Sequence, residues 1–286
     1  MGSADASRAR DLSAYSGLAT WLDVYDHAQW RAPGATVASI AARGVKTLFL
    51  ETGNSRQPTD VVRPRQLGRL VDAAHAAGLK VGAWYLPTLI YSPRDLRRVL
   101  AAVHFTTPAG GHFDSFALDI EASDVRTVTL RNTRLLALSE ALRAAVGNAY
   151  PLGAIVPSGV GMERHPKYWP GFPYARLRQS FDVFLPMAYY TYRVKGRAPS
   201  ARYVMRSVAL LRAGAGADVP VHVIGGIANK TGPGEAAGFM DAVARCGPIG
   251  YSLYDFPITS SSTWKALASP PPAPASPAAC SAPPIP

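Results

Sequence analysis

The chain has 286 residues, of which 48% are hydrophobic and 17% charged, so it can bury a large core and needs no disulfide framework to fold. No apolar run approaches the roughly 20 residues that cross a bilayer, which excludes a membrane-spanning protein. The formal net charge is +11, but 24 of the 30 basic residues are arginines scattered along the chain, which argues against a nucleic-acid-binding patch. Adhesion to polyanions such as cell-wall polymers stays open beside a merely solvated surface.

Eight short runs rich in β-branched and aromatic residues follow one another, with starts 25 to 38 residues apart. They are TWLDVYD (20–26), VKTLFLET (45–52), LKVGAWYLP (79–87), FDSFALDIE (113–121), YPLGAIVPS (150–158), FDVFLPMAYY (181–190), VPVHVIGGI (219–227) and PIGYSLYDF (248–256). Helices are expected between them at 36–43, 64–77, 94–103, 126–146 and 201–212.

This spacing matches one strand, one helix and two loops, so it predicts an α/β fold, a single (β/α)₈ TIM barrel over residues 18–268. A doubly wound open sheet is the alternative. No G-x-G-x-x-G turn follows the first strand, which favours the barrel.

The two ends of the chain differ in composition from the barrel. Residues 1–17 are expected to be an N-terminal lead without the apolar segment of an intact signal peptide. Residues 269–286 carry eight of the 25 prolines, which predicts a disordered Pro-rich tail. Cys246 and Cys280 fit neither a metal site nor a disulfide framework, and a bridge into such a tail would have little structural purpose. We therefore expect no disulfide, and the redox compartment stays open.

The fourth run contains a pair of carboxylates. In a TIM barrel, functional residues gather at the C-terminal ends of the strands. Because side chains alternate along a strand, Asp119 and Glu121 share the inner face with Ala117, whereas Leu118 and Ile120 face the helices. An ionised Asp119 raises the pKa of Glu121, as a general acid at neutral pH requires. A structural alternative is that Arg or Tyr side chains neutralise the pair.

Further carboxylates and aromatic rings are expected at the barrel mouth. A second catalytic carboxylate could be Asp23 or Glu51, although Glu51 could instead cap the turn that follows it. Flat rings with polar edges suit stacking on sugars. The predicted substrate-binding residues are Asp23, Glu51, Trp84, Tyr85, Tyr189, Tyr190, Tyr254 and Asp255.

Other signals concern the loop at 161–177, the histidines and a serine. The loop is long, aromatic and Pro-rich, and we expect it to form a substrate wall or lid. The six histidines show no metal-ligand spacing, and Ser158 lacks a G-x-S-x-G elbow. Neither a metal site, nor another cofactor, nor a serine nucleophile is expected.

These motifs resemble those of TIM-barrel glycoside hydrolases. FDSFALDIE is similar to the family 18 chitinase signature D-x-x-D-x-D-x-E, with Ala117 in place of one Asp, and PMAYY (186–190) resembles that family's M-x-Y-D, with Tyr190 in place of the Asp. Three segments resemble family 25 lysozymes: WLDVYDHAQW (21–30), AAGLKVGAWY (76–85) and ALDIE (117–121). The whole chain looks most like uncharacterised glycosidase-like barrel proteins of high-G+C bacteria.

The lysozyme resemblance implies site roles for Asp23, Asp119 and Glu121, with Glu121 as the acid, and a weaker correspondence for Asp255. Residues and resemblance together favour a glycoside hydrolase with Glu121 as general acid/base and Asp119 orienting it or stabilising charge. The first alternative is a catalytically silent glycan-binding barrel. The second is a metal-dependent hydrolase with Asp23, Glu51, Asp119 and Glu121 as oxygen ligands.

The expected partner is a polysaccharide or oligosaccharide, not nucleic acid. We expect a monomer that acts outside the cell or at the cell wall, while a cytoplasmic location stays open.

Overall fold

The computed structural model describes residues 10–269 and Cys280, and within them eight parallel strands form a closed barrel. The strands are β1 (Gly17–Leu22), β2 (Thr47–Asn54), β3 (Lys80–Leu86), β4 (Ser115–Asp119), β5 (Leu152–Pro157), β6 (Val183–Met187), β7 (His222–Ile227) and β8 (Gly250–Tyr254). Each pairs with the next, and β1 closes the ring by pairing with β8, with Gly17 opposite Gly250. The predicted TIM barrel is therefore confirmed.

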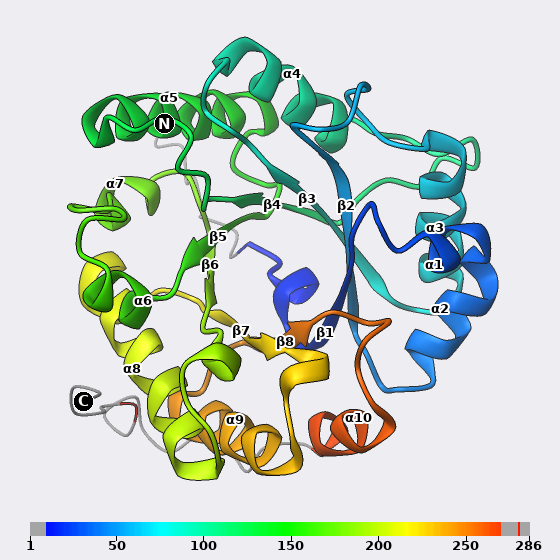
Figure 1. Cartoon of the computed structure of the whole chain (residues 1–286). Coiled ribbons are helices and arrows are strands. Elements are labelled where there is room, and N and C mark those ends of the chain that lie inside the picture. Colours follow the sequence, from blue (N-terminus) through cyan, green and yellow to red (C-terminus); the bar gives the residue numbers. More distant parts are fainter. Residues whose placement is uncertain (1–9, 270–279, 281–286) are drawn as a thin grey trace, which may run out of the picture.

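Helices surround the strands on the outside (Figure 1). They are α1 (His27–Arg31), α2 (Pro33–Ala41), α3 (Pro64–Ala76), α4 (Ser92–Val103), α5 (Val128–Val146), α6 (Gly159–Arg164), α7 (Tyr174–Leu177), α8 (Arg197–Ala215), α9 (Pro233–Cys246) and α10 (Ser261–Ala268), with 3₁₀ turns η1 (Ser13–Tyr15), η2 (Tyr190–Tyr192) and η3 (Ala228–Lys230). All five predicted helices are present. The first strand differs from its prediction, because pairing with β8 starts it at Gly17 and the polar segment from Asp23 lies in the following loop.

The apolar core has two layers, one inside the barrel and one between strands and helices. The inner layer includes Trp21 stacked on Phe49 with ring centroids 4.3 Å apart. Leu18 and Leu22 on the same strand as Trp21 belong to the outer layer. Strand alternation therefore decides which side chains can reach the barrel mouth.

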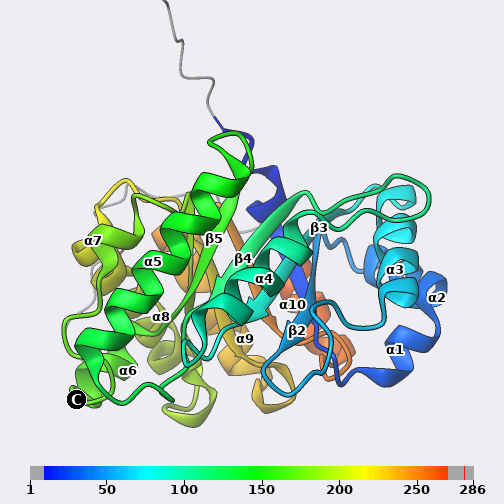
Figure 2. The same cartoon turned by 90° about the horizontal axis from the view of Figure 1, so that it is seen from above.

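The N-terminal end of the barrel is closed by η1. Tyr15 is fully buried; its hydroxyl donates to the Phe116 carbonyl at 2.7 Å, and its own carbonyl lies 2.8 Å from Nδ1 of His222. Figure 2 shows α1 and α6, which follow β1 and β5, at the edge of the barrel opposite to η1. Residues 13–15, predicted to belong to a lead, are thus part of the barrel floor, and the open mouth is at the other end.

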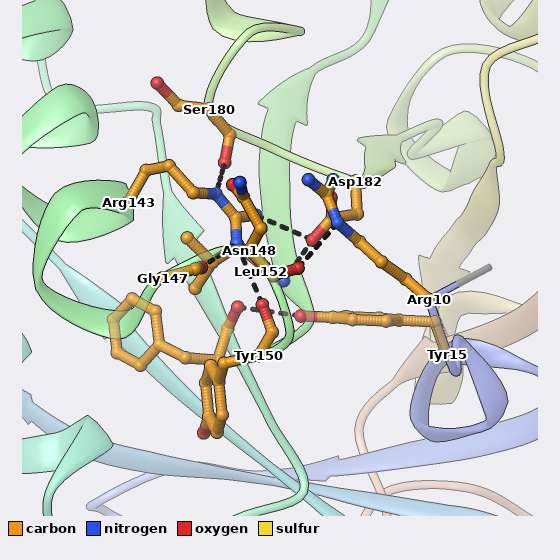
Figure 3. Close-up of polar contacts among 10 residues, drawn as sticks. Arg10, Tyr15, Arg143, Gly147, Asn148, Tyr150, Leu152, Ser180 and Asp182 are labelled. Carbon is orange, nitrogen blue, oxygen red and sulfur yellow. Dashed lines mark hydrogen bonds and ion pairs between the residues drawn. The ribbon is translucent and has the colours of Figure 1, made fainter. Parts of the chain in front are cut away.

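A charged network beside this floor is centred on Asp182, just before β6 (Figure 3). Asp182 Oδ2 accepts hydrogen bonds from Arg143 Nη2 at 2.7 Å and from the Leu152 amide at 2.8 Å, while Arg10 pairs with the other oxygen. Arg143 also donates to backbone carbonyls, including that of Ser180 at 2.9 Å. The network ties α5 to the starts of β5 and β6.

We expect Asp182→Ala to lower the free energy of unfolding by about 3–5 kcal/mol, because Arg143 would stay buried without its counter-charge. Denaturant unfolding followed by circular dichroism measures this. Asp218→Ala removes an exposed partner of Arg178 and should change stability little. Equal losses in the two variants would contradict a stabilising role for the buried network.

A disulfide joins Cys246 at the end of α9 to Cys280, with Cα atoms 4.5 Å apart, so the expectation of no disulfide is wrong. Both cysteines are buried. Sequence spacing did not reveal that the chain after α10 returns to α9. The intervening segment contains β8 and α10, so the bridge closes a loop around the last unit of the barrel. Apart from Ser269 and Cys280, the predicted disordered tail lies outside the described residues.

Replacing both cysteines by serine should lower the free energy of unfolding by about 2–4 kcal/mol, because the cross-link no longer restricts the unfolded chain. Denaturant titration of the wild type with and without a reducing agent also compares the free energy of unfolding with the disulfide intact and broken. The double variant should not respond to the reductant. A wild-type midpoint unchanged by complete reduction would show that the bridge adds no stability.

Among the described residues, no helix has the length and apolar character that a membrane crossing requires.

Candidate active site

The centre of the candidate site is the end of β4. Ala117 lies in the inner core layer, whereas Leu118 and Ile120 lie in the outer layer. This is the predicted alternation, and it directs Asp119 into the barrel mouth. Asp119 is 7% exposed, and its Oδ1 accepts no hydrogen bond from the described residues. Asp114, the first carboxylate of the chitinase-like motif, lies at the opposite end of β4 and accepts from Lys80 Nζ at 2.9 Å.

Glu121 follows Asp119 and forms part of the wall of a pocket of about 430 Å³. The Tyr168 hydroxyl donates to the backbone carbonyl of Glu121, and Glu121 is an exposed residue. The pocket is lined by Glu121, Pro157, Ser158, Gly161, Met162, His165, Tyr168, Met187, Tyr189, Arg193 and Tyr203. A carboxyl group at the wall of a cavity of this size is placed to reach a bound sugar.

The pKa values of both carboxyl groups are raised. Burial raises the pKa of Asp119 well above its ordinary range, and the nearby charges of Glu121 and Glu51 add to the effect. Desolvation raises the pKa of Glu121, although the residue as a whole is exposed. Because the charge of one group acts on the other, losing the first proton makes loss of the second harder. One carboxyl can then hold a proton while the other is charged.

Glu51 lies within β2 and is fixed by two hydrogen bonds. Its Oε2 accepts from the Val24 amide and its Oε1 from Asn54 Nδ2, both at 2.9 Å. Burial raises the pKa of Glu51 to about 7, and the charges of Asp23 and Asp26 raise it further against the lowering effect of these bonds. Glu51 therefore links the β1 loop to β2, and it also faces Asp119 closely enough for their charges to interact.

Three more carboxylates lie together between β1 and β8, and we call them the acidic corner: Asp23, Asp26 and Asp255. One oxygen of each lies within 4.8 Å of the others. Tyr254 donates its hydroxyl to Asp23 Oδ2 at 2.7 Å. Burial raises the pKa of Asp26 to about 6 and that of Asp255 to about 7.

The predicted aromatic residues separate into two groups. Trp84 is in the inner layer, and Tyr189 and Tyr254 pack against that layer, so these three rings lie at the mouth. Tyr85 and Tyr190 do not. Both lie in the outer layer, where the Tyr85 hydroxyl donates to Asp95 at 2.7 Å and the Tyr190 hydroxyl lies 3.2 Å from Thr231 Oγ1.

The residues of the loop at 161–177 also fall into two groups, one that lines the pocket and one that is buried. Met162, His165 and Tyr168 line the pocket, as expected of a substrate wall. Trp169 instead is buried, with the Arg131 guanidinium 4.5 Å from its ring centroid. Ser158 caps α6 by accepting from the Gly161 amide at 2.8 Å, which is a structural role.

Several residues of the site were not predicted from the sequence. Asn54 holds Glu51, Asp26 completes the acidic corner, and Arg193 lines the pocket. Asp26 was detectable because it follows the first strand, but Asn54 and Arg193 carry no sequence pattern. Of the alternative metal-ligand set, only Asp23 belongs to a group of acidic side chains in residues 10–269 that could share an ion.

The sequence matches no family model and no curated protein. Solved structures of three glycoside hydrolases share the fold. The spore cortex-lytic enzyme SleL of Bacillus cereus aligns with a TM-score of 0.66 at 8% identity, over 88% of this chain and 73% of that one. A chitinase of Chromobacterium violaceum aligns with a TM-score of 0.61 at 12% identity, over 88% of this chain and 98% of that one. The endo-beta-1,4-mannanase of Thermotoga petrophila aligns with a TM-score of 0.63 at 10% identity, over 85% of this chain and 68% of that one.

The barrel is thus one that glycoside hydrolases use. The comparisons support this part of the predicted resemblance, and they give no support to the family 25 lysozyme part or to a relationship with proteins of high-G+C bacteria. Because these identities are very low, the likeness concerns the fold alone.

Proposed function

We propose that the protein is a glycoside hydrolase that cleaves a polysaccharide, with Glu121 as general acid/base and Asp119 as its charged partner. The observation that carries the proposal is the placement of Asp119 inside the barrel mouth beside Glu121, which forms part of the pocket wall. Two interacting carboxyl groups with raised pKa values can supply one proton donor and one negative charge at neutral pH.

In this mechanism Glu121 donates its proton to the glycosidic oxygen as the bond from that oxygen to the anomeric carbon breaks. Positive charge develops at the anomeric carbon. Asp119, which is charged in the state in which Glu121 holds the proton of the pair, stabilises it. Water then attacks the same carbon, and its proton goes to the Glu121 carboxylate, which restores the acid. Tyr189 and Tyr254 provide ring faces for the sugar.

The substrate wall of Met162, His165 and Tyr168 would hold the part of the chain beyond the cleaved bond. We further propose action outside the cell or at the cell wall, because the Cys246–Cys280 disulfide favours an oxidising compartment. Chitinases and a cortex-lytic enzyme share the barrel, which makes cell-wall glycans a reasonable first substrate class.

A panel of cell-wall preparations and purified polysaccharides, assayed for released reducing ends, tests the proposal. We expect release from at least one glycan by the wild type. Binding of glycans without release from any of them would favour the silent-binder alternative. Release that disappears with a chelator and returns with a divalent cation would favour the metal-dependent one.

A further inference from the structure

The acidic corner occupies a separate part of the mouth from the pocket beside Glu121. It comes from the loop after β1 and from the end of β8, whereas the residues that line the pocket run from Glu121, just after β4, to Tyr203 in α8. The mechanism above uses none of its three carboxylates. Their convergence within 4.8 Å therefore needs a separate explanation, since like charges at this distance repel one another.

Hydrogen bonds fix the corner but do not neutralise it. Asp23 accepts from the Tyr25 amide at 2.6 Å and from the Tyr254 hydroxyl at 2.7 Å, and Asp26 accepts from the Asp23 amide at 2.9 Å. Asp255 is only 5% exposed, and its Oδ1 has no partner among the described residues. A buried carboxylate oxygen without a donor is costly unless a ligand supplies one.

The lack of a basic partner is notable in a chain with a net charge of +11. Many surface carboxylates here are paired, for example Asp241 with Arg197 at 2.6 Å and Glu163 with Arg206. In the described part of the chain, no lysine or arginine forms an ion pair with Asp23, Asp26 or Asp255. The three carboxyl groups thus have no basic partner among the described residues, although the protein carries a net positive charge.

We propose that the acidic corner binds a protonated amine of the substrate, so that the glycan is one with free amino sugars. This inference rests on the proposed glycoside hydrolase function. An ammonium group offers three N–H donors, which match three converging carboxylates, and its charge offsets their mutual repulsion. A hydrated divalent cation is the alternative ligand, because a hard cation held by a few carboxylates completes its coordination with water.

The aromatic residues beside the corner suit the ring that would carry the amine. Tyr254 connects the acidic corner to the aromatic residues. Its hydroxyl donates to Asp23, and its ring lies edge-on to that of Trp84 with ring centroids 6.5 Å apart. A sugar packed against Tyr254 would have one edge toward the acidic corner, because the hydroxyl of this ring donates to Asp23. An N-acetyl group there would be neutral and bulkier, and would leave the Asp255 carboxylate without a cationic partner.

Calorimetric titration of the full-length Glu121→Gln variant, which should bind without turnover, tests the inference. The probes are a glucosamine hexamer and its fully N-acetylated form. We expect the free-amine form to bind at least about tenfold more tightly, because charge-assisted hydrogen bonds to a desolvated site exceed those of a neutral amide. Adding Asp255→Asn or, separately, Asp26→Asn should remove the preference. Adding Asp11→Asn, an equal charge change on the exposed floor side, should keep it.

Equal affinities for the two hexamers would overturn the inference. If the chelator-treated protein then gained thermal stability with calcium, magnesium or manganese, and Asp255→Asn lost this gain, the corner would be a metal site. Wild-type cleavage of neutral glycans without an amine preference would leave the proposed function standing. An amine preference with no cleavage of any glycan would instead overturn the proposed function and keep the amine site.

Discussion

Replacing Glu121 by glutamine is expected to lower kcat about 10²- to 10⁴-fold, the range that general acid catalysis contributes. The amide keeps the shape of the side chain, but it has no acidic proton for the leaving oxygen. Glu121 is an exposed residue, and no described residue forms a hydrogen bond with its side chain, so the fold should be unaffected. Reducing-end release on the substrate found with the panel measures the rate, and thermal unfolding measures the stability.

Glu140→Gln is the matched control, because Glu140 is an exposed carboxylate on α5 that pairs with Arg176 at 3.0 Å. It should retain the wild-type rate. If Glu121→Gln also retained it, the acid assignment would be wrong. Glu51, with a pKa raised to about 7, would then be the first candidate for the acid.

The Asp119→Asn variant is expected to lose about 10²- to 10³-fold in kcat, because the developing positive charge at the anomeric carbon loses its carboxylate. It should also change the pH profile. An ionised Asp119 disfavours ionisation of Glu121, so removing that charge lowers the pKa of Glu121. The alkaline limb of kcat/KM, where the acid loses its proton, should then move to lower pH.

The stability of the same variant should not fall at neutral pH. Folding raises the pKa of Asp119, so wild-type stability decreases as the pH rises from the unfolded value toward the folded one. Asparagine does not titrate and avoids this loss. Denaturant unfolding of Asp119→Asn at neutral pH should therefore give a free energy of unfolding equal to or larger than that of the wild type.

In the pH profile of kcat/KM, an alkaline limb of Asp119→Asn that stays in place or moves to higher pH would contradict the coupling of the two carboxyl groups.

Strand alternation explains both the success and the errors of the predicted site. It placed Asp119 inward and Leu118 outward correctly. The same rule means that neighbours on one strand cannot both face inward, so Trp84 and Tyr85 could not both have lined the mouth. Pairing with β2 places Trp84 inside, and Tyr85 packs outward against Asp95.

Long-range contacts account for the features that the sequence did not indicate. The acidic corner joins the first and last strands of the barrel, and the Cys246–Cys280 bridge depends on the path taken after α10. Neither has a local pattern of residues. Arg143 and Asp182 likewise meet only because the fold brings the end of α5 to the residue that precedes β6.

The sequence by itself determined the number of strands, five of the helices, and which end of the barrel carries the carboxylates, because these follow from local periodicity and from chain direction. Only the tertiary structure decided which side chains meet there. Barrel closure sets Asp255 beside Asp23, and β5, β6 and their loops shape the pocket at Glu121. Such contacts depend on packing between segments far apart in the chain, and no short stretch of sequence encodes them.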